Sequence, residues 1–159
     1  RHAMIIAFTG HRPDKLGGYR IPNRTYLIIT NEIRRLLLEK KPERIISGMA
    51  LGVDQWAAEA AYELDIPYIA AVPFVGQDKM WPQEAKDKYA QLLSRAFGAI
   101  VVSPGGYSAE KMQVRNQWMV IMCDELIAVW DGSPGGTANC IAYAKSVNIP
   151  ITYIEVPKR

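Results

Sequence analysis

Cysteine and histidine are scarce in this sequence, with two of each among 159 residues. Cys123 and Cys140 do not stand at a spacing typical of metal ligands, and two histidines add little to a possible zinc site. The sequence therefore predicts no metal site and no cofactor. So few cysteines are also typical of a reducing compartment, and we expect a cytoplasmic protein.

Long apolar runs and a strong charge of one sign are missing as well. No apolar run reaches the roughly 18 residues that a membrane span requires, so no membrane partner is expected. No signal peptide is recognisable, and residues 1–3 resemble the remnant of a tag, which leaves one expected domain over residues 4–159. A net charge of +3 is too small to indicate nucleic-acid binding by itself.

The sequence does contain a regular alternation of short apolar runs and helical patterns. The apolar runs predict strands at 4–8, 44–47, 67–73, 99–102, 126–130 and 151–154. Helices are predicted between the cap Asn23 and Pro42, and at 53–64, 83–95, 110–123 and 137–147. This order predicts an α/β protein with a three-layer Rossmann-like fold, in which helices cover both faces of a mainly parallel sheet of about six strands.

Glycine recurs in the loops that follow the predicted strands. The loops are 9–12, 47–54, 73–77, 103–107 and 131–137, and each contains at least one glycine. Ligands of such sheets bind beyond the carboxyl ends of the strands, where these loops lie together. The sequence therefore predicts a ligand cleft at that edge of the sheet.

Gly135-Gly136-Thr137 stands at the start of the last predicted helix. Paired glycines expose backbone N–H groups, and the first turn of a helix adds unpaired donors and a partial positive charge. This segment predicts a phosphate cradle. The alternative is an ordinary tight connection between a strand and a helix.

Arg115 is predicted on a helical face that should pack toward the sheet. The other members of this face are uncharged: Met112, Asn116, Met119 and Met122. A buried guanidinium needs a partner, because an unpaired buried charge is costly. That partner is either a ligand phosphate, with Asn116 as a neighbouring hydrogen bonder, or an internal acid such as Asp124 or Asp131.

Other residues also have more than one interpretation. Arg12 binds a phosphate or lies on the surface before a turn, and His11 acts as an acid or base or is structural. Asp54 serves the site or stabilises the start of a helix. Asp131 is a catalytic carboxylate, a ligand of a ribose hydroxyl, or the first residue of a turn. Trp81 stacks on a base or seals the edge of the core.

The chain resembles the SLOG superfamily, which groups the Lonely Guy (LOG) enzymes with the DNA-processing protein DprA, and it is most similar to the YpsA-like branch. The segment 9–13 (TGHRP) looks like the opening motif of that branch, and 47–54 (SGMALGVD) is similar to a glycine motif shared with DprA. The helix with Arg115 and the loop 131–140 match the arginine helix and the nucleotide loop of the superfamily.

The resemblance implies a Rossmann-like fold that binds a nucleotide or a nucleotide-derived phosphorylated ligand, as a sensor or a processing domain. The residues expected to contact this ligand are Thr9, Gly10, Arg12, Ser47, Gly48, Gly52, Asp54, Arg115, Asn116, Gly135, Gly136 and Thr137.

The resemblance also implies two alternatives and a partner. A LOG-type hydrolase would cleave the N-glycosidic bond of a nucleoside 5′-monophosphate, but the glutamate of that family is Cys140 here, so Asp131 or Glu59 would have to supply the carboxylate. A DprA-like module would bind single-stranded DNA, although the chain lacks a clear basic and aromatic stripe. As in LOG-like proteins, a homodimer paired through helices is expected, with Trp118 and Tyr62 as spare aromatic residues.

Overall fold

A parallel sheet forms the centre of the computed structural model, which describes residues 3–158. Within these residues it has six strands in the order β4-β3-β2-β1-β5-β6, and every neighbouring pair is parallel. The strands are β1 (Ile5–Gly10), β2 (Arg44–Ser47), β3 (Tyr68–Val72), β4 (Gly98–Val101), β5 (Glu125–Trp130) and β6 (Ile151–Glu155). Of the expected tag remnant, residues 1 and 2 lie outside the described part of the chain.

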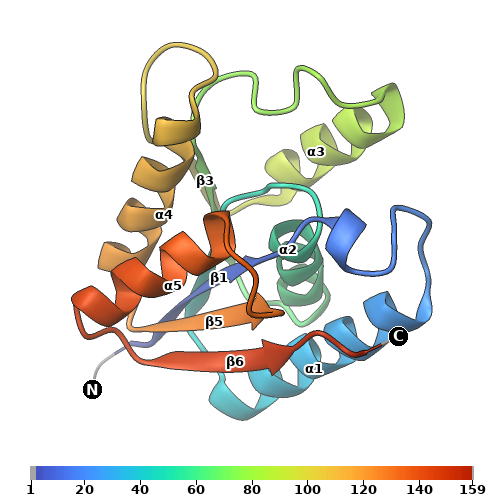
Figure 1. Ribbon diagram of the computed structural model, residues 1–159, viewed down its shortest axis with the longest axis vertical. Helices are drawn as coiled ribbons and strands as arrows, with labels where there is room; N and C mark the ends of the chain where they lie inside the picture. Colours follow the sequence, from blue (N-terminus) through green and yellow to red (C-terminus); the bar gives the residue numbers. More distant parts are fainter. Residues whose placement is uncertain (1–2, 159) are drawn as a thin grey trace.

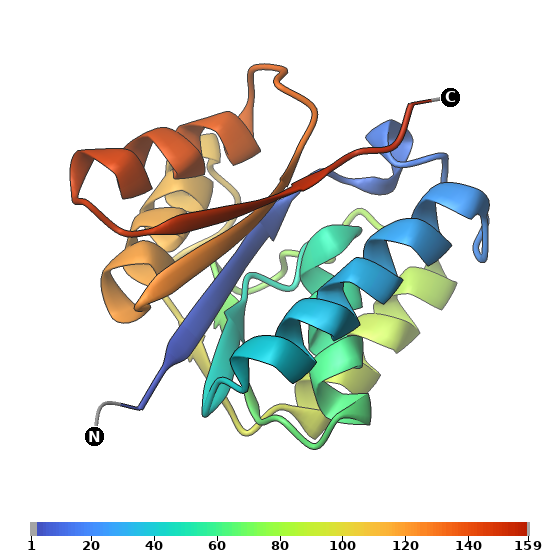
Figure 2. The ribbon, with the colours of Figure 1, turned by 90° about the horizontal axis from the view of Figure 1, so that it is seen from below.

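Helices cover both faces of this sheet (Figures 1 and 2). One face carries α1 (Arg24–Lys40), α2 (Val53–Glu63) and α3 (Gln83–Arg95), and the other carries α4 (Ala109–Met122) and α5 (Gly136–Ser146). A short 3₁₀ helix, η1 (Pro13–Lys15), follows β1. The predicted three-layer α/β fold is confirmed. None of the helices within residues 3–158 is long and apolar enough to cross a membrane.

Local chemistry sets the ends of α1 as the sequence predicts. The side chain of Asn23 accepts a hydrogen bond from the backbone N–H of Tyr26 at 2.9 Å, which satisfies one of the open donors of the first turn. At the other end Lys41 adopts a left-handed conformation, with φ of 47°, directly before Pro42.

The sheet separates two apolar cores, and β1 contributes to both. Ile6 and Phe8 pack on the side of α1 and α2, whereas Ala7 packs on the side of α4 and α5. All three side chains are fully buried because β1 lies in the middle of the sheet with helices on both faces.

The direction in which the strands are added reverses next to β1. From β1 the chain builds β2, β3 and β4 toward one edge, and β5 and β6 then fill the other side. The chain therefore leaves β1 toward α1 on one face and leaves β5 toward α5 on the opposite face. Such a switch point opens a crevice at the carboxyl ends of the two strands, which is where ligands of α/β sheets bind.

Candidate functional site

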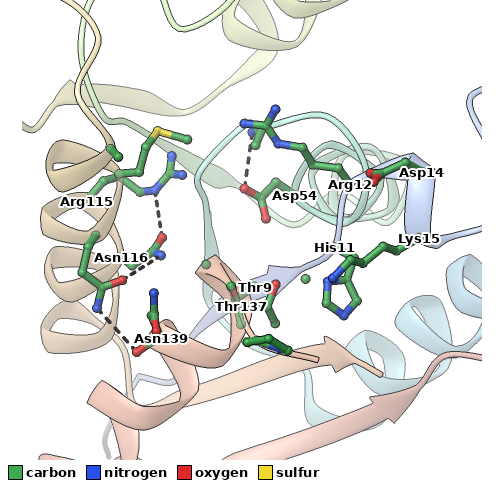
Figure 3. Close-up of a pocket in the computed structure, with 18 of the residues that line it drawn as sticks. Thr9, His11, Arg12, Asp14, Lys15, Asp54, Arg115, Asn116, Thr137 and Asn139 are labelled. Atoms are coloured by element: carbon green, nitrogen blue, oxygen red, sulfur yellow. Dashed lines mark hydrogen bonds between the residues drawn. The ribbon is translucent and has the colours of Figure 1, made fainter. Parts of the chain in front are cut away.

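A cavity of about 460 Å³ lies at this switch point. Four segments form its walls: the end of β1 with η1, the start of α2, the start of α4 with the loop before it, and the first turn of α5 (Figure 3). Most of the residues predicted to contact a ligand line it: Thr9, Gly10, Arg12, Asp54, Arg115, Asn116, Gly135, Gly136 and Thr137.

The other predicted residues, Ser47, Gly48 and Gly52, support the cavity from outside its lining. Ser47 is fully buried, and its hydroxyl donates to the carbonyl of Asp54 at 2.7 Å. Gly52 has φ of 95°, and a Cβ at this position would lie 2.4 Å from the carbonyl oxygen of His11. A glycine is therefore required at the point where the loop between β2 and α2 passes the loop after β1.

Arg115 reaches from α4 to the carboxyl ends of β2 and β3. Its side chain is buried, and Nη1 donates to the carbonyl of Gly48 at 2.6 Å and to that of Ala71 at 3.1 Å. Nε donates to Oδ1 of Asn116 at 3.1 Å. Nη2 makes no hydrogen bond to any residue within 3–158, so one arm of the fork has no protein partner there.

The prediction that Asp124 or Asp131 is the internal partner of Arg115 is wrong. The carboxylate of Asp124 accepts the backbone N–H of Ile5, at the amino end of β1, and Asp131 bonds other groups. Backbone carbonyls take their place. Met122 also departs from the predicted buried face, because its side chain is 48% exposed.

Asp54 is a buried carboxylate whose charge acts on Arg115. It sits in the first turn of α2 and accepts a hydrogen bond from the backbone N–H of Ala50 at 3.3 Å. Burial raises the pKa of Asp54 to about 6, and the positive charge of Arg115 opposes this rise. A Cβ on Gly48 would lie 2.5 Å from Nη1 of Arg115 and 2.8 Å from Oδ2 of Asp54, so glycine makes room for both groups above β2.

Asp131 organises the turn between β5 and α5. Its Oδ1 accepts hydrogen bonds from the backbone N–H and the hydroxyl of Ser133 and lies 2.9 Å from Nε2 of His11. These bonds, chiefly those from Ser133, lower the pKa of Asp131 to about 2. Burial lowers the pKa of His11, although the carboxylate of Asp131 opposes this shift. Asp131 does not line the cavity, and its catalytic role stays a prediction.

The structure adds cavity residues that the sequence reading missed. Lys15 lies in η1 and donates from Nζ to the hydroxyl of Ser133 at 2.7 Å. Gln113 and Asn139 also line the cavity, together with Tyr107 from the predicted cleft loop 103–107. Gln113 stands one helical turn before Asn116, and this spacing is the one signal that could have revealed it.

Comparison with known families decides where this architecture belongs. The model of the YspA SLOG family matches residues 6–158. The chain belongs to this family.

Two relatives from Bacillus species show sequence similarity over most of the chain. The uncharacterized SPbeta prophage-derived protein YoqJ of Bacillus subtilis is 37% identical over 129 residues, which cover 71% of this chain and 75% of YoqJ. A UPF0398 protein of Bacillus thuringiensis is 30% identical over 149 residues, covering 88% of this chain and 81% of the relative.

Solved structures share the SLOG fold at lower identity. DNA processing protein A of Helicobacter pylori, described for its binding of single-stranded DNA, superposes with a TM-score of 0.67 at 21% identity, covering 98% of this chain and 66% of that one. DprA of Streptococcus pneumoniae gives 0.71 at 18% identity, covering 99% of this chain and 51% of that one. The molybdenum cofactor carrier protein of Chlamydomonas reinhardtii superposes with a TM-score of 0.60 at 18% sequence identity, covering 96% of this chain and 76% of that one.

In this SLOG chain, Cys140 is a core residue. It lies on the buried side of α5, and its thiol is fully buried. Burial raises the pKa of this thiol to about 12, although a hydrogen bond from Thr9 opposes the shift. Glu59 lies away from the cavity, where it forms an ion pair with Lys88 on α3 at 2.9 Å. The described carboxylates that do line the cavity are Asp14 and Asp54.

Trp81 also lies outside the cavity lining. Its ring packs edge-on against Tyr89, with 5.2 Å between the ring centroids, and contacts the core on the side of α2 and α3. The structure therefore places it at the edge of the core, as the second reading of the sequence has it.

Proposed function

We propose that the cavity binds a nucleotide or a nucleotide-derived phosphorylated ligand, with a phosphate at the amino end of α5. The observation that carries the proposal is the convergence of this helix end and three basic side chains, Arg12, Lys15 and Arg115, on one cavity. Open backbone donors and a partial positive charge at a helix end favour an anion, and the basic groups add charge-assisted hydrogen bonds.

The backbone before α5 is open to close approach. A Cβ added to Gly135 or Gly136 would meet no atom within 4 Å, so the space in front of the first turn is empty of protein atoms. Gly135 has φ of 137°, a conformation that side-chain-bearing residues rarely adopt. A phosphate can therefore reach the N–H groups of this turn directly.

One cationic group of the cavity, that of Arg12, has no partner among the described residues. The guanidinium of Arg12 is exposed in the cavity and makes no hydrogen bond or ion pair with any residue between 3 and 158. A guanidinium without a protein partner keeps its full bidentate capacity for a phosphate.

Removing the Arg12 charge should weaken phosphate-containing ligands and spare the matching nucleosides. We expect Arg12→Gln to cost about 1.5–3 kcal/mol of binding free energy for a nucleoside monophosphate, the value of a hydrogen bond to a charged group. Calorimetric titration with AMP, IMP, ADP, ADP-ribose and adenosine measures this. Arg20→Gln, in the same loop region but outside the cavity lining, is the matched control. If no phosphorylated ligand binds at millimolar concentration, the proposed function is wrong.

The hydrolase and DNA alternatives have less support from the cavity. N-glycosidic cleavage needs a carboxylate at the sugar. The position of the catalytic glutamate of LOG enzymes is Cys140 here, which is buried and has a thiol pKa of about 12. Binding of single-stranded DNA favours a continuous basic groove, whereas this cavity also carries the carboxylates of Asp14 and Asp54.

We also propose that the protein is a homodimer that pairs through α4. Val114, Ile121 and Met122 share one face of this helix and are 38%, 58% and 48% exposed, with Trp118 half-buried among them. Tyr62 is less suited to the role, because the guanidinium of Arg95 stacks on its ring at 4.7 Å.

Light scattering at tens of micromolar protein should give twice the chain mass of 17.8 kDa. Ile121→Lys should shift the mass toward one chain, because a buried lysine at an apolar interface is unfavourable. Leu38→Lys, at an equally exposed position on α1, should leave the mass unchanged. A parent protein that scatters as 17.8 kDa would rule out the dimer.

A further inference from the structure

Two nearly buried side chains of the cavity each have one polar atom without a protein partner. Arg115 is 4% exposed and Asp54 is 8% exposed, and both line the cavity. Arg115 donates through Nε and Nη1, and the carboxylate of Asp54 accepts through Oδ2. Nη2 of Arg115 and Oδ1 of Asp54 therefore make no hydrogen bond within residues 3–158.

Both of these atoms are open to the cavity. Among the fully buried side-chain nitrogens and oxygens within residues 3–158, Oε1 of Gln77 alone has no hydrogen-bond partner. Nη2 and Oδ1 have none either, so they are not fully buried, and the cavity is the space that their side chains line. A ligand in the cavity can therefore bond to each of them.

The unused donor and the unused acceptor belong to side chains that meet above Gly48, at the end of β2. A Cβ on Gly48 would lie 2.5 Å from Nη1 of Arg115 and 2.8 Å from Oδ2 of Asp54. The positive charge of Arg115 acts on Asp54, but no nitrogen of Arg115 donates a hydrogen bond to it. Nη2 and Oδ1 consequently place an N–H donor and an oxygen acceptor on one wall of the cavity.

The chemistry of these two atoms limits the ligand group that fits them. A guanidinium only donates, and an ionised carboxylate only accepts. A phosphate has no donor for Asp54 and meets its negative charge, whereas an ammonium group has no acceptor for Arg115 and meets its positive charge. A hydroxyl suits both, because it donates its hydrogen and accepts through its oxygen.

The position of the pair relative to Arg12 points to a sugar hydroxyl. Asp54 lies between Arg115 and Arg12 in the cavity (Figure 3), and both positive charges act on it. In a nucleotide the sugar is joined directly to the phosphate, and the base lies beyond the sugar. A phosphate held near Arg12 and the first turn of α5 therefore brings the sugar, before the base, to Asp54.

Resting on the proposed function, we infer that Asp54 and Arg115 form a sugar subsite, in which the carboxylate accepts a ribose hydroxyl that also bonds Nη2 of Arg115. The subsite favours ribonucleotides over nucleotides whose sugar lacks hydroxyl groups, since removal of the hydroxyl leaves a nearly buried charge without its partner. A buried carboxylate loses hydration, and the contact with the ligand offsets part of that cost.

AMP and 2′,3′-dideoxy-AMP test the subsite, because they share the base and the phosphate and differ only in the two ribose hydroxyls. Calorimetry at pH 8, where a carboxyl with a pKa of about 6 is ionised, should show that AMP binds at least about 10-fold tighter. Asp54→Asn should reduce this ratio to below about 3-fold. The backbone N–H of Ala50 requires the amide oxygen, so the amide nitrogen takes the position of Oδ1 and no longer accepts.

Asp14→Asn is the matched control, because it also removes one negative charge from the cavity lining, at an exposed position. This variant should keep the parent ratio of the two affinities. Neither variant should weaken the binding of inorganic phosphate, since both make the cavity more positive. Urea unfolding of both variants shows that they are folded under the conditions of the titrations.

Two results would overturn the sugar subsite while nucleotide binding stands: equal affinities of the parent for AMP and 2′,3′-dideoxy-AMP, or a ratio that Asp54→Asn leaves unchanged. If Asp54→Asn weakens AMP but not ribose 5-phosphate, the pair contacts the base, and the sugar subsite is wrong as well. If AMP, 2′,3′-dideoxy-AMP and ribose 5-phosphate all fail to bind, the proposed function fails, and the sugar subsite fails with it.

Discussion

Replacing Arg115 with methionine should lower the free energy of unfolding by about 3–5 kcal/mol, the loss expected when one partner of a buried charged network is removed. The guanidinium donates to the carbonyls of Gly48 and Ala71, and its charge stabilises the buried carboxylate of Asp54 more than that of Arg12 does. Methionine fills a similar volume, so the loss measures the missing charge and hydrogen bonds more than a cavity. Urea unfolding of the ligand-free protein measures it.

Two further variants separate the possible causes of the loss. Adding Asp54→Asn to Arg115→Met should recover part of the stability, because the stranded carboxylate is then gone. Arg34→Met, which removes a half-exposed ion pair with Glu63 on the surface of α1 and α2, should cost below about 1 kcal/mol. If Arg115→Met costs no more than Arg34→Met, Arg115 has no structural role in the empty protein.

The stability role of Arg115 is a result that residue patterns alone do not give. The sequence identifies a lone cation on an apolar helix face and so predicts that it needs a partner. Its actual partners, the carbonyls of Gly48 and Ala71, end two different strands, and backbone acceptors leave no trace in a sequence pattern. The same side chain has structural partners through Nη1 and Nε, while Nη2 has no hydrogen-bond partner within residues 3–158.

The fold itself was predictable because each element has a local signal. Continuous apolar runs mark the parallel strands, of which β2, β3 and β5 are largely buried and the edge strand β4 is largely exposed, and Asn23 and Pro42 mark the ends of α1. The strand order was not predicted, since it depends on which strands pair across the whole chain. That order creates the switch point, and it explains why the loops after β1 and β5 share one cavity with α4.

Some cavity residues can be recognised from their neighbours in the sequence, whereas others reach the cavity only through the tertiary structure. Glycines before a helix and a lone arginine are visible in the sequence, and Gly135, Gly136 and Arg115 do line the cavity. Lys15 and Asn139 line it because η1 and α5 both border the cavity. Ser47 and Gly52 belong to the glycine motif but hold the loops in place, which a motif match cannot distinguish from contact with a ligand.

Asp54 should make the protein less stable as the pH rises from about 4 to about 6, by on the order of 3 kcal/mol. Burial raises the folded-state pKa of this carboxyl from an ordinary 3.8 to about 6, so the folded protein holds the proton more tightly than the unfolded chain does. The resulting stability is complete below the unfolded pKa and is lost as the pH rises through the folded pKa. The carboxylate that remains above this pH is buried at the cost of its hydration, which Arg115 repays only in part.

The difference between the parent and Asp54→Asn isolates this contribution, because other groups titrate in the opposite sense. Asp131, with its pKa lowered to about 2, adds stability as the pH rises from 2 toward 4, and His11, with a lowered pKa, adds stability as the pH rises through its ordinary value of 6.5. Both effects are shared by the two proteins and cancel. Urea unfolding at half-unit steps from pH 4 to pH 7 should give a parent curve that falls relative to the variant, and parallel curves would show that folding does not raise the pKa of Asp54.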